Sequence, residues 1–256
     1  SGDDVVFRVG DRVSKTKEKW FLYRGPDQKK RPKKFDWIGA PAMAPDGSRV
    51  VVWEQPGAKM DKSGYYMRKD VVLVGGWKKK SGRYDDGRLL SPPIFSRDSQ
   101  SVFSAMEQHG SWLLLRIDKK GEKALIKNLM SIPDFAVDAS GKKVAASAVV
   151  HSFPGGAGPK TFLFGGQPSV GSVEIHSGRD VIGKDFDAAW SPTFSPNGKS
   201  LAYKVMRAGR MGVCADDKAK AQLEWDFVTR PVFSPDGKHV AFAGSKDTVF
   251  AYGSPT

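Results

Sequence analysis

One twelve-residue pattern recurs along the chain and limits the fold more than any other feature of the sequence. Two copies are nearly identical: residues 192–203 read Pro-Thr-Phe-Ser-Pro-Asn-Gly-Lys-Ser-Leu-Ala-Tyr, and residues 231–242 read Pro-Val-Phe-Ser-Pro-Asp-Gly-Lys-His-Val-Ala-Phe. Related copies occupy residues 41–52, 93–104 and 135–146. A pattern that returns roughly every 50 residues predicts a fold built from repeated structural units.

Each copy centres on a tight turn. Asp and Asn side chains at such turns accept hydrogen bonds from their own backbone, and Gly adopts a positive φ at little cost. We therefore predict structural roles for three residue pairs: Asp46 and Gly47, Asn197 and Gly198, and Asp236 and Gly237. In the second copy Ser99 replaces the glycine. Because Ser tolerates the left-handed conformation less well, we expect the turn at Ser99 to be distorted.

The segments between the turns indicate strands. They are short apolar runs rich in Val and aromatic residues, such as residues 50–53, 113–117 and 200–205, and helical periodicity is nearly absent. Two further runs follow each turn unit, which makes four strands per repeat and predicts the blades of a β-propeller.

The sequence thus predicts an all-β chain, a β-propeller of four-stranded blades in a single domain over residues 1–256. We expect six blades, with five as the alternative, closed by pairing of the N- and C-terminal segments because a closed ring has no open sheet edge. Residues 3–40 supply a partial blade without a turn unit, with strands expected near residues 5–9, 20–24 and 33–37.

The repeat resembles the WD-like repeat of the TolB-type β-propellers, and the resemblance covers residues 41–256 through its five copies. It is specific for the fold, since the same repeat occurs in unrelated proteins. It implies a bacterial, non-catalytic propeller that binds another protein, as known members scaffold envelope complexes. A closed ring gives no reason to expect more than a monomer. The resemblance also implies a periplasmic or extracytoplasmic location, with a signal already removed ahead of Ser1; a cytoplasmic location stays open.

Composition and motifs exclude several other functions. A single Cys excludes an intrachain disulfide, and no apolar run approaches the ~18 residues of a transmembrane helix. The four His residues lack metal-ligand spacing, and residues 166–171 do not have the spacing of a hydrolase nucleophile turn. We therefore predict no metal, no cofactor, no catalytic residue and no enzymatic activity.

The net charge of +13 raises an alternative function. Most of the excess Lys and Arg residues fall in turns expected at one end of the ring, which suggests weak binding of a polyanion. Acidic residues are interspersed, and Tyr84 is the only aromatic residue in these basic segments, so solvated turns explain the charge better than a polyanion site does. A carbohydrate-binding propeller and an accessory propeller of a larger enzyme or receptor are further alternatives.

The opposite end of the ring is expected to carry the long loops and the junctions between blades. Aromatic and Arg side chains on such loops are typical of protein-binding surfaces. The partner-binding candidates are Trp37, Tyr65, Tyr66, Arg68, Trp190, Arg207 and Arg210. For Trp37 and Trp190, packing between adjacent blades is an equally good interpretation.

Overall fold

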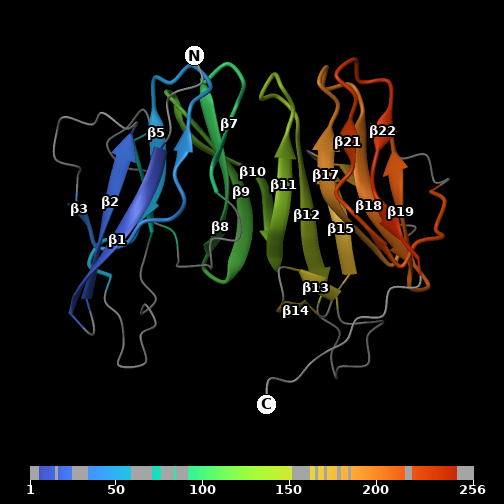
Figure 1. The fold of residues 1–256 in the computed structure, drawn as a ribbon, viewed down its shortest axis with the longest axis horizontal. Helices are drawn as coiled ribbons and strands as arrows, with labels where there is room; N and C mark the ends of the chain where they lie inside the picture. Colours follow the sequence, from blue (N-terminus) through green and yellow to red (C-terminus); the bar gives the residue numbers. More distant parts are fainter. Residues whose placement is uncertain are drawn as a thin grey trace. The chain divides into compact units, whose positions relative to one another are not determined.

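The structure is a computed structural model that describes residues 6–14, 17–24, 34–58, 71–75, 84, 92–151, 162–164, 167–169, 172–177, 180–183, 186–216 and 221–246. It divides into two compact units, each treated separately below (Figure 1). Unit 1 comprises Ser1–Ile132 and Ala139–Lys142, and unit 2 comprises Pro133–Asp138 and Lys143–Thr256.

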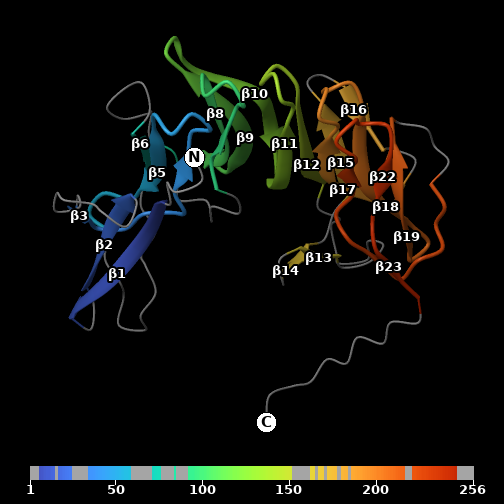
Figure 2. The same cartoon turned by 45° about the horizontal axis from the view of Figure 1, so that its top comes forward.

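Unit 1 contains three antiparallel sheets. The first, in the order β1-β2-β3, consists of β1 (Val6–Ser14), β2 (Lys17–Arg24) and β3 (Lys34–Phe35), and β1 and β2 form its long ribbon in Figure 2. The second, β4-β5-β6, consists of β4 (Ala42–Met43), β5 (Val50–Glu54) and β6 (Val72–Val74), extended by a bridge between Val71 and Tyr84. The third, β10-β9-β8-β7, consists of β7 (Ile94–Phe95), β8 (Ser101–Gln108), β9 (Ser111–Asp118) and β10 (Gly121–Leu129).

Unit 2 contains one seven-stranded sheet and three two-stranded sheets among its described strands. One group of four strands pairs in the order β11-β12-β15-β16: β11 (Ser131–Val137), β12 (Val144–His151), β15 (Ser172–Ser177) and β16 (Asp180–Ile182). A second group of three strands consists of β17 (Ala188–Phe194), β18 (Leu201–Arg207) and β19 (Arg210–Ala215). One parallel pair between β15 and β17 connects the two groups into a single sheet. Three short pairs complete the unit: β13 (Phe162–Phe164) with β14 (Gln167–Ser169), β20 (Phe227–Val228) with β23 (Gly244–Ser245), and β21 (Val232–Phe233) with β22 (Val240–Ala241).

The five sequence repeats each form a β-hairpin, namely β4–β5, β7–β8, β11–β12, β17–β18 and β21–β22. The all-β prediction is confirmed, with many antiparallel sheets. The three strands expected within residues 3–40 are β1, β2 and β3. The described strands form no closed sheet, so the number of blades, their closure and the single domain over residues 1–256 stay predictions.

The repeat turns share one geometry. The backbone N–H at the glycine position donates to the carbonyl three residues earlier, at 2.8–2.9 Å, in the turns of Gly47, Ser99, Gly198 and Gly237. The Asp or Asn before it accepts from the backbone N–H two residues ahead, as Asp46 Oδ1 does from Ser48 and Asn197 Oδ1 from Lys199, both at 2.9 Å. These contacts agree with turn-forming roles for these residues, and the assignment of those roles stays a prediction.

The expected distortion at Ser99 is wrong. Ser99 has φ of 59°, close to the 65–70° of the glycines at Gly47, Gly198 and Gly237. The preceding hairpin holds it there, because Ser99 Oγ accepts from the backbone N–H of Asp46 at 3.1 Å and its carbonyl accepts from Arg49 Nη2 at 3.2 Å. These contacts offset the strain of a non-glycine residue in the left-handed region.

The turn carboxylates predict a pH dependence of stability. Hydrogen bonds from a Ser hydroxyl and then from the backbone lower the pKa of Asp46, Asp98 and Asp236 below the ordinary value. A carboxyl group whose pKa is lowered by folding stabilises the folded protein above pH ~4, the ordinary carboxyl pKa. This stabilisation is lost as the pH falls through the pKa of the folded state. Replacing all three by Asn, which keeps the acceptor as Asn197 does, should flatten the fall of Tm between about pH 4 and pH 2. An equally steep fall in the triple variant would contradict this assignment.

The cores of the two units lie between neighbouring sheets. In unit 1, Val51, Trp53 and Tyr84 pack with Met106 and Leu115, and the indole N–H of Trp53 donates to Ser104 Oγ at 2.9 Å. In unit 2, Ile175, Tyr203, Val205 and the free thiol of Cys214 form a second buried cluster. These sheet-to-sheet contacts position the site described next.

Candidate functional site

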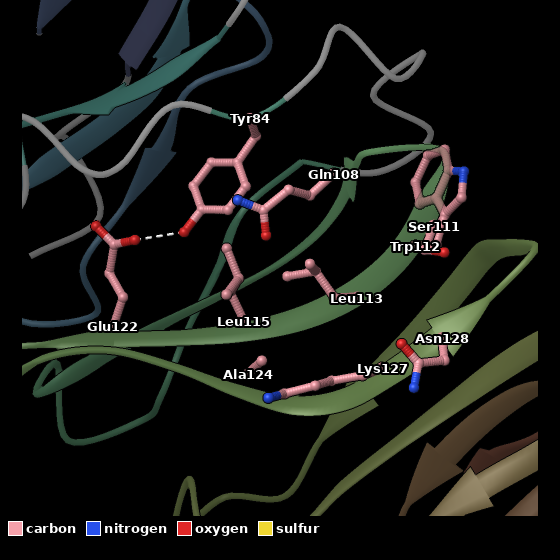
Figure 3. A pocket seen from close by; sticks show the side chains of 10 residues that line it. All are labelled: Tyr84, Gln108, Ser111, Trp112, Leu113, Leu115, Glu122, Ala124, Lys127 and Asn128. Atoms are coloured by element: carbon pink, nitrogen blue, oxygen red, sulfur yellow. Dashed lines mark hydrogen bonds between the residues drawn. The ribbon is translucent and has the colours of Figure 1, made fainter.

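A cavity of ≈ 400 Å³ lies against strands β8, β9 and β10 of the sheet β7–β10, and we call it the blade pocket (Figure 3). Its lining is supplied by β8, β9, β10 and the preceding segment: Tyr84, Gln108, Ser111, Trp112, Leu113, Leu115, Glu122, Ala124, Lys127 and Asn128. Leu113, Leu115 and Ala124 form an apolar floor, and the polar side chains lie around it.

Irregular pairing of β10 explains why the pocket forms there. Ala124 pairs with Leu115, but the next pairs are Ile126 with Leu114 and Leu129 with Trp112, so the register shifts twice. Asn128 lies within the second shift and has φ of 60°. Since a β-bulge bends its strand and re-aims its side chains, these two bulges bring both Lys127 and Asn128 to the lining of the pocket.

Tyr84 and Glu122 close one side of the pocket. The Tyr84 hydroxyl donates to Glu122 Oε2, and the Tyr84 ring meets Trp53 edge-to-face with centroids 5.9 Å apart. Burial first, and then the Glu122 carboxylate, raise the pKa of Tyr84 above its ordinary value. Tyr84 therefore stays protonated and serves as a fixed wall with its donor engaged.

The chemistry of the pocket suits binding by apolar contact and hydrogen bonding. The amides of Gln108 and Asn128 and the hydroxyl of Ser111 offer both donors and acceptors. One cation, Lys127, and one anion, Glu122, line it, so the lining carries no formal net charge. Within the described residues, no group of three or more His, Cys, Asp or Glu side chains is arranged to hold a metal ion.

Some of the sequence-predicted partner-binding residues already have intramolecular contacts. Trp37 is half-buried, and its carbonyl accepts from the backbone N–H of Gln55 at 3.1 Å. Trp190 is half-buried and packs against Val149 and Ala188 of the same unit. The partial burial of Trp190 agrees with packing between adjacent blades. Part of its side chain is still exposed, so a role in partner binding stays a proposal.

Arg207 and Arg210 lie together as a cross-strand pair at the tip of the β18–β19 hairpin. Both are exposed; the Arg207 guanidinium lies 4.9 Å from the Phe186 ring centroid, and Arg210 Nη1 lies 2.6 Å from Asp226 Oδ1. Tyr65, Tyr66 and Arg68 lie outside the described residues. The assignment of all these residues to partner binding stays a prediction.

Sequence analysis missed the blade pocket and also the buried Lys204. The bulges of β10 leave no recognisable pattern in the sequence, so the pocket could not be inferred from it. Lys204 had a signal: it interrupts the apolar strand Leu-Ala-Tyr-Lys-Val-Met, residues 201–206, whose side chains are all buried. A charged residue in such a run is unusual unless it is paired or functional.

No family model and no curated protein matches the sequence. Solved structures do match. TolB from Acinetobacter baumannii is 15% identical, with 93% of this chain and 57% of that chain covered and a TM-score of 0.42. A eukaryotic initiation factor is 14% identical, with 94% and 57% covered and a TM-score of 0.51. The β-propeller domain of the Trilobed protease from Pyrococcus furiosus is 10% identical, with 87% and 82% covered and a TM-score of 0.42.

At these identities the likeness concerns the fold alone. The chain has a TolB-like propeller fold, which confirms the resemblance of its repeats. It spans 57% of the length of TolB and of the initiation factor. The described part of the chain contains no helix that is long and apolar enough to cross a membrane.

The prediction that the chain is not an enzyme is corrected. A puromycin hydrolase is among the similar structures, at 14% identity, with 92% of this chain and 40% of that chain covered and a TM-score of 0.45. The prediction treated the fold as non-catalytic because no nucleophile motif was found. Structures of this kind include enzymes, so an activity is compatible with the fold.

Proposed function

We propose that this propeller binds a partner protein and that the blade pocket receives an apolar side chain of that partner. The observation that carries the proposal is the combination of an apolar floor with a rim of amide and hydroxyl groups in one cavity. Enclosing a leucine-sized side chain contributes about 1.5–3 kcal/mol, and the amides of Gln108 and Asn128 can bond the peptide groups on either side of it. The β8–β9 turn beside Gln108 and Ser111 belongs to the end predicted to carry the long loops.

Two other ligand classes fit the pocket less well. A sugar ring needs an open aromatic face, but Trp112 is only 7% exposed and offers little of its ring. A polyanion needs an excess of cations, but Lys127 is balanced by Glu122 in the lining. Peptide binding uses both the floor and the rim of the pocket.

The wider binding surface belongs to the same proposal. We include the long-loop candidates Trp37, Tyr65, Tyr66, Arg68, Trp190, Arg207 and Arg210 as further contacts of the partner. We also propose that the protein acts as a monomer, and that it lies in the periplasm or another extracytoplasmic compartment, as the TolB-type resemblance implies. Each of these statements is independent of the pocket.

A titration with three probes tests the proposal. The tripeptide Ac-Gly-Leu-Gly-NH2, maltotriose and a heparin oligosaccharide are each added to 15N-labelled protein, and amide and side-chain NMR shifts are recorded. We expect the tripeptide alone to shift Gln108, Ser111 and Asn128, with a Kd of about 1 mM, since that affinity corresponds to about −4 kcal/mol. Shifts at these residues with maltotriose or heparin but not with the tripeptide would overturn the proposal.

Substitutions at the pocket rim should weaken tripeptide binding without unfolding the blade. Asn128→Gly removes the amide and keeps the positive φ, which glycine adopts freely. Lys127→Glu adds a second anion beside the pocket. We expect each variant to weaken binding about 3- to 10-fold, since a lost hydrogen bond is worth about 0.5–1.5 kcal/mol.

Lys123→Glu is the matched control for Lys127→Glu. It lies on the same strand and is exposed, but it does not line the pocket. Binding by this variant should equal that of the wild type. If Lys123→Glu weakens binding as much as Lys127→Glu does, the effect is one of general charge and the pocket is not the site.

A further inference from the structure

Lys204 is a buried cation at the centre of unit 2. It lies on β18 opposite Trp190 of β17, and it is only 8% exposed. Its Nζ lies 5.1 Å from the ring centroid of Trp190 and 5.1 Å from that of Phe227. Within the described residues, no hydrogen bond or ion pair to Lys204 Nζ is formed. Lys204 therefore holds its ammonium group between two aromatic rings, and its N–H donors have no acceptor among the described residues.

This arrangement is costly for the protein alone. A buried ammonium group without an acceptor loses the hydration of its N–H groups, and contact with aromatic faces restores only part of that loss. Burial, and next the proximity of Arg230, lower the pKa of Lys204, while Asp134 acts in the opposite direction. A largely buried cation with a lowered pKa, held at a fixed position between two aromatic rings, is a candidate for a binding site.

A second cation, Arg230, lies close enough to Lys204 to lower the pKa of its ammonium group. Arg230 is paired with Asp134 of β11, and the two side chains are 50% and 28% exposed. Arg230 and Asp134 are both more exposed to solvent than Lys204. The three side chains together carry two positive charges and one negative charge. The surplus positive charge predicts attraction of a single carboxylate.

The surroundings of these cations favour a peptide over a small free anion. Phe227 and Val232, which flank Arg230 along the chain, are 40% and 55% exposed. Exposed apolar side chains around a charged centre are the composition of a protein-binding hot spot. An acidic residue with apolar neighbours would use both features.

We propose that Lys204 and Arg230 bind the carboxylate of an acidic residue in a partner segment whose apolar neighbours contact Phe227 and Val232. The bound carboxylate accepts hydrogen bonds from Lys204 Nζ and shares Arg230 with Asp134. This site lies in unit 2 and does not rest on the blade pocket, which lies in unit 1.

Calorimetric titration with three probes tests the site. Ac-Val-Glu-Val-NH2 should bind, Ac-Val-Gln-Val-NH2 should bind at least 10-fold more weakly, and propionate should bind more weakly than the Glu peptide. Equal binding of the Glu and Gln peptides would overturn carboxylate recognition. Propionate binding as tight as the Glu peptide would overturn the peptide assignment, and no binding of any probe would overturn the site.

Variants locate the binding. Lys204→Met and Arg230→Gln should each lower the affinity for the Glu peptide at least 10-fold. Lys246→Gln is the matched control, because Lys246 also lies in an ion pair of unit 2, with Glu224, and is 50% exposed, as Arg230 is. An equal loss in Lys246→Gln would show that net charge, and not this site, governs the affinity.

Lys204→Met also provides a test by stability. The pKa of Lys204 is lower in the folded protein than in the unfolded chain, where it has the ordinary value of ~10.5. Between these two pKa values the unfolded chain binds more protons, so the free energy of unfolding increases as the pH rises. Arg230 and Asp134 are the charged groups that set this pKa. We expect Lys204→Met to raise Tm by about 2–4 °C near pH 7 and to lose the rise with pH. A lower Tm in the variant would mean that Lys204 stabilises the fold and is not held for a ligand.

Discussion

Gly75→Ala is expected to lower the free energy of unfolding by at least about 3 kcal/mol, the largest effect of any single glycine substitution in unit 1. A Cβ on Gly75 would lie 2.1 Å from the carbonyl oxygen of Val50, and φ is +94°. Gly75 directly follows β6, whose Val74 pairs with Val52 of β5, so the new methyl group would force the two strands apart. Urea unfolding followed by circular dichroism measures the change.

Gly110→Ala separates the steric effect from the conformational one. Gly110 also has a positive φ, +76°, but a Cβ there would have no heavy atom within 4 Å. We expect a loss of only about 1 kcal/mol, the cost of placing a non-glycine residue in the left-handed region. Equal losses in Gly75→Ala and Gly110→Ala would contradict the close approach of β5 and Gly75.

Trp53→Ala should cost about 4 kcal/mol, comparable to the largest core truncations in other proteins. Trp53 is 1% exposed, and its indole N–H donates to the buried Ser104 Oγ at 2.9 Å. Truncation removes the largest side chain shared by the sheets β4–β6 and β7–β10. It also removes the ring that supports Tyr84, so tripeptide binding at the blade pocket should fall with stability.

Trp53→Phe and Ser104→Ala divide this loss into its parts. Trp53→Phe keeps an aromatic ring and loses the N–H donor, and should cost about 1–2 kcal/mol. If the hydrogen bond matters, the double variant should lose less than the sum of the two single losses, since each single change already breaks the bond. Additive losses would contradict a coupling between Trp53 and Ser104.

Local chemistry made the repeats predictable. A turn of Asp or Asn followed by Gly determines its own conformation, and three of the five hairpins have one; the other two could be placed by their likeness to these copies. Ser99 was misjudged because the contacts that hold it come from Asp46 and Arg49, one repeat away. Turn geometry is local, but tolerance of strain depends on tertiary neighbours.

The candidate sites were harder to predict, for a physical reason. The blade pocket depends on two register shifts in β10, and such shifts depend on how the sheet packs rather than on residue type. Lys204 could have been noticed as a charge in a buried strand. Its relation to Trp190, Phe227 and Arg230 arises only when β17, β18 and the segment containing β20 come together.

Intermolecular nuclear Overhauser effects between the peptide and the protein test the proposed function most directly. Protein labelled at Leu and Ala methyl groups is mixed with saturating Ac-Gly-Leu-Gly-NH2. The proposal predicts cross-peaks from the peptide's leucine methyl groups to Leu113, Leu115 and Ala124, the floor of the blade pocket. Cross-peaks to other methyl groups only, or none at saturation, would contradict it.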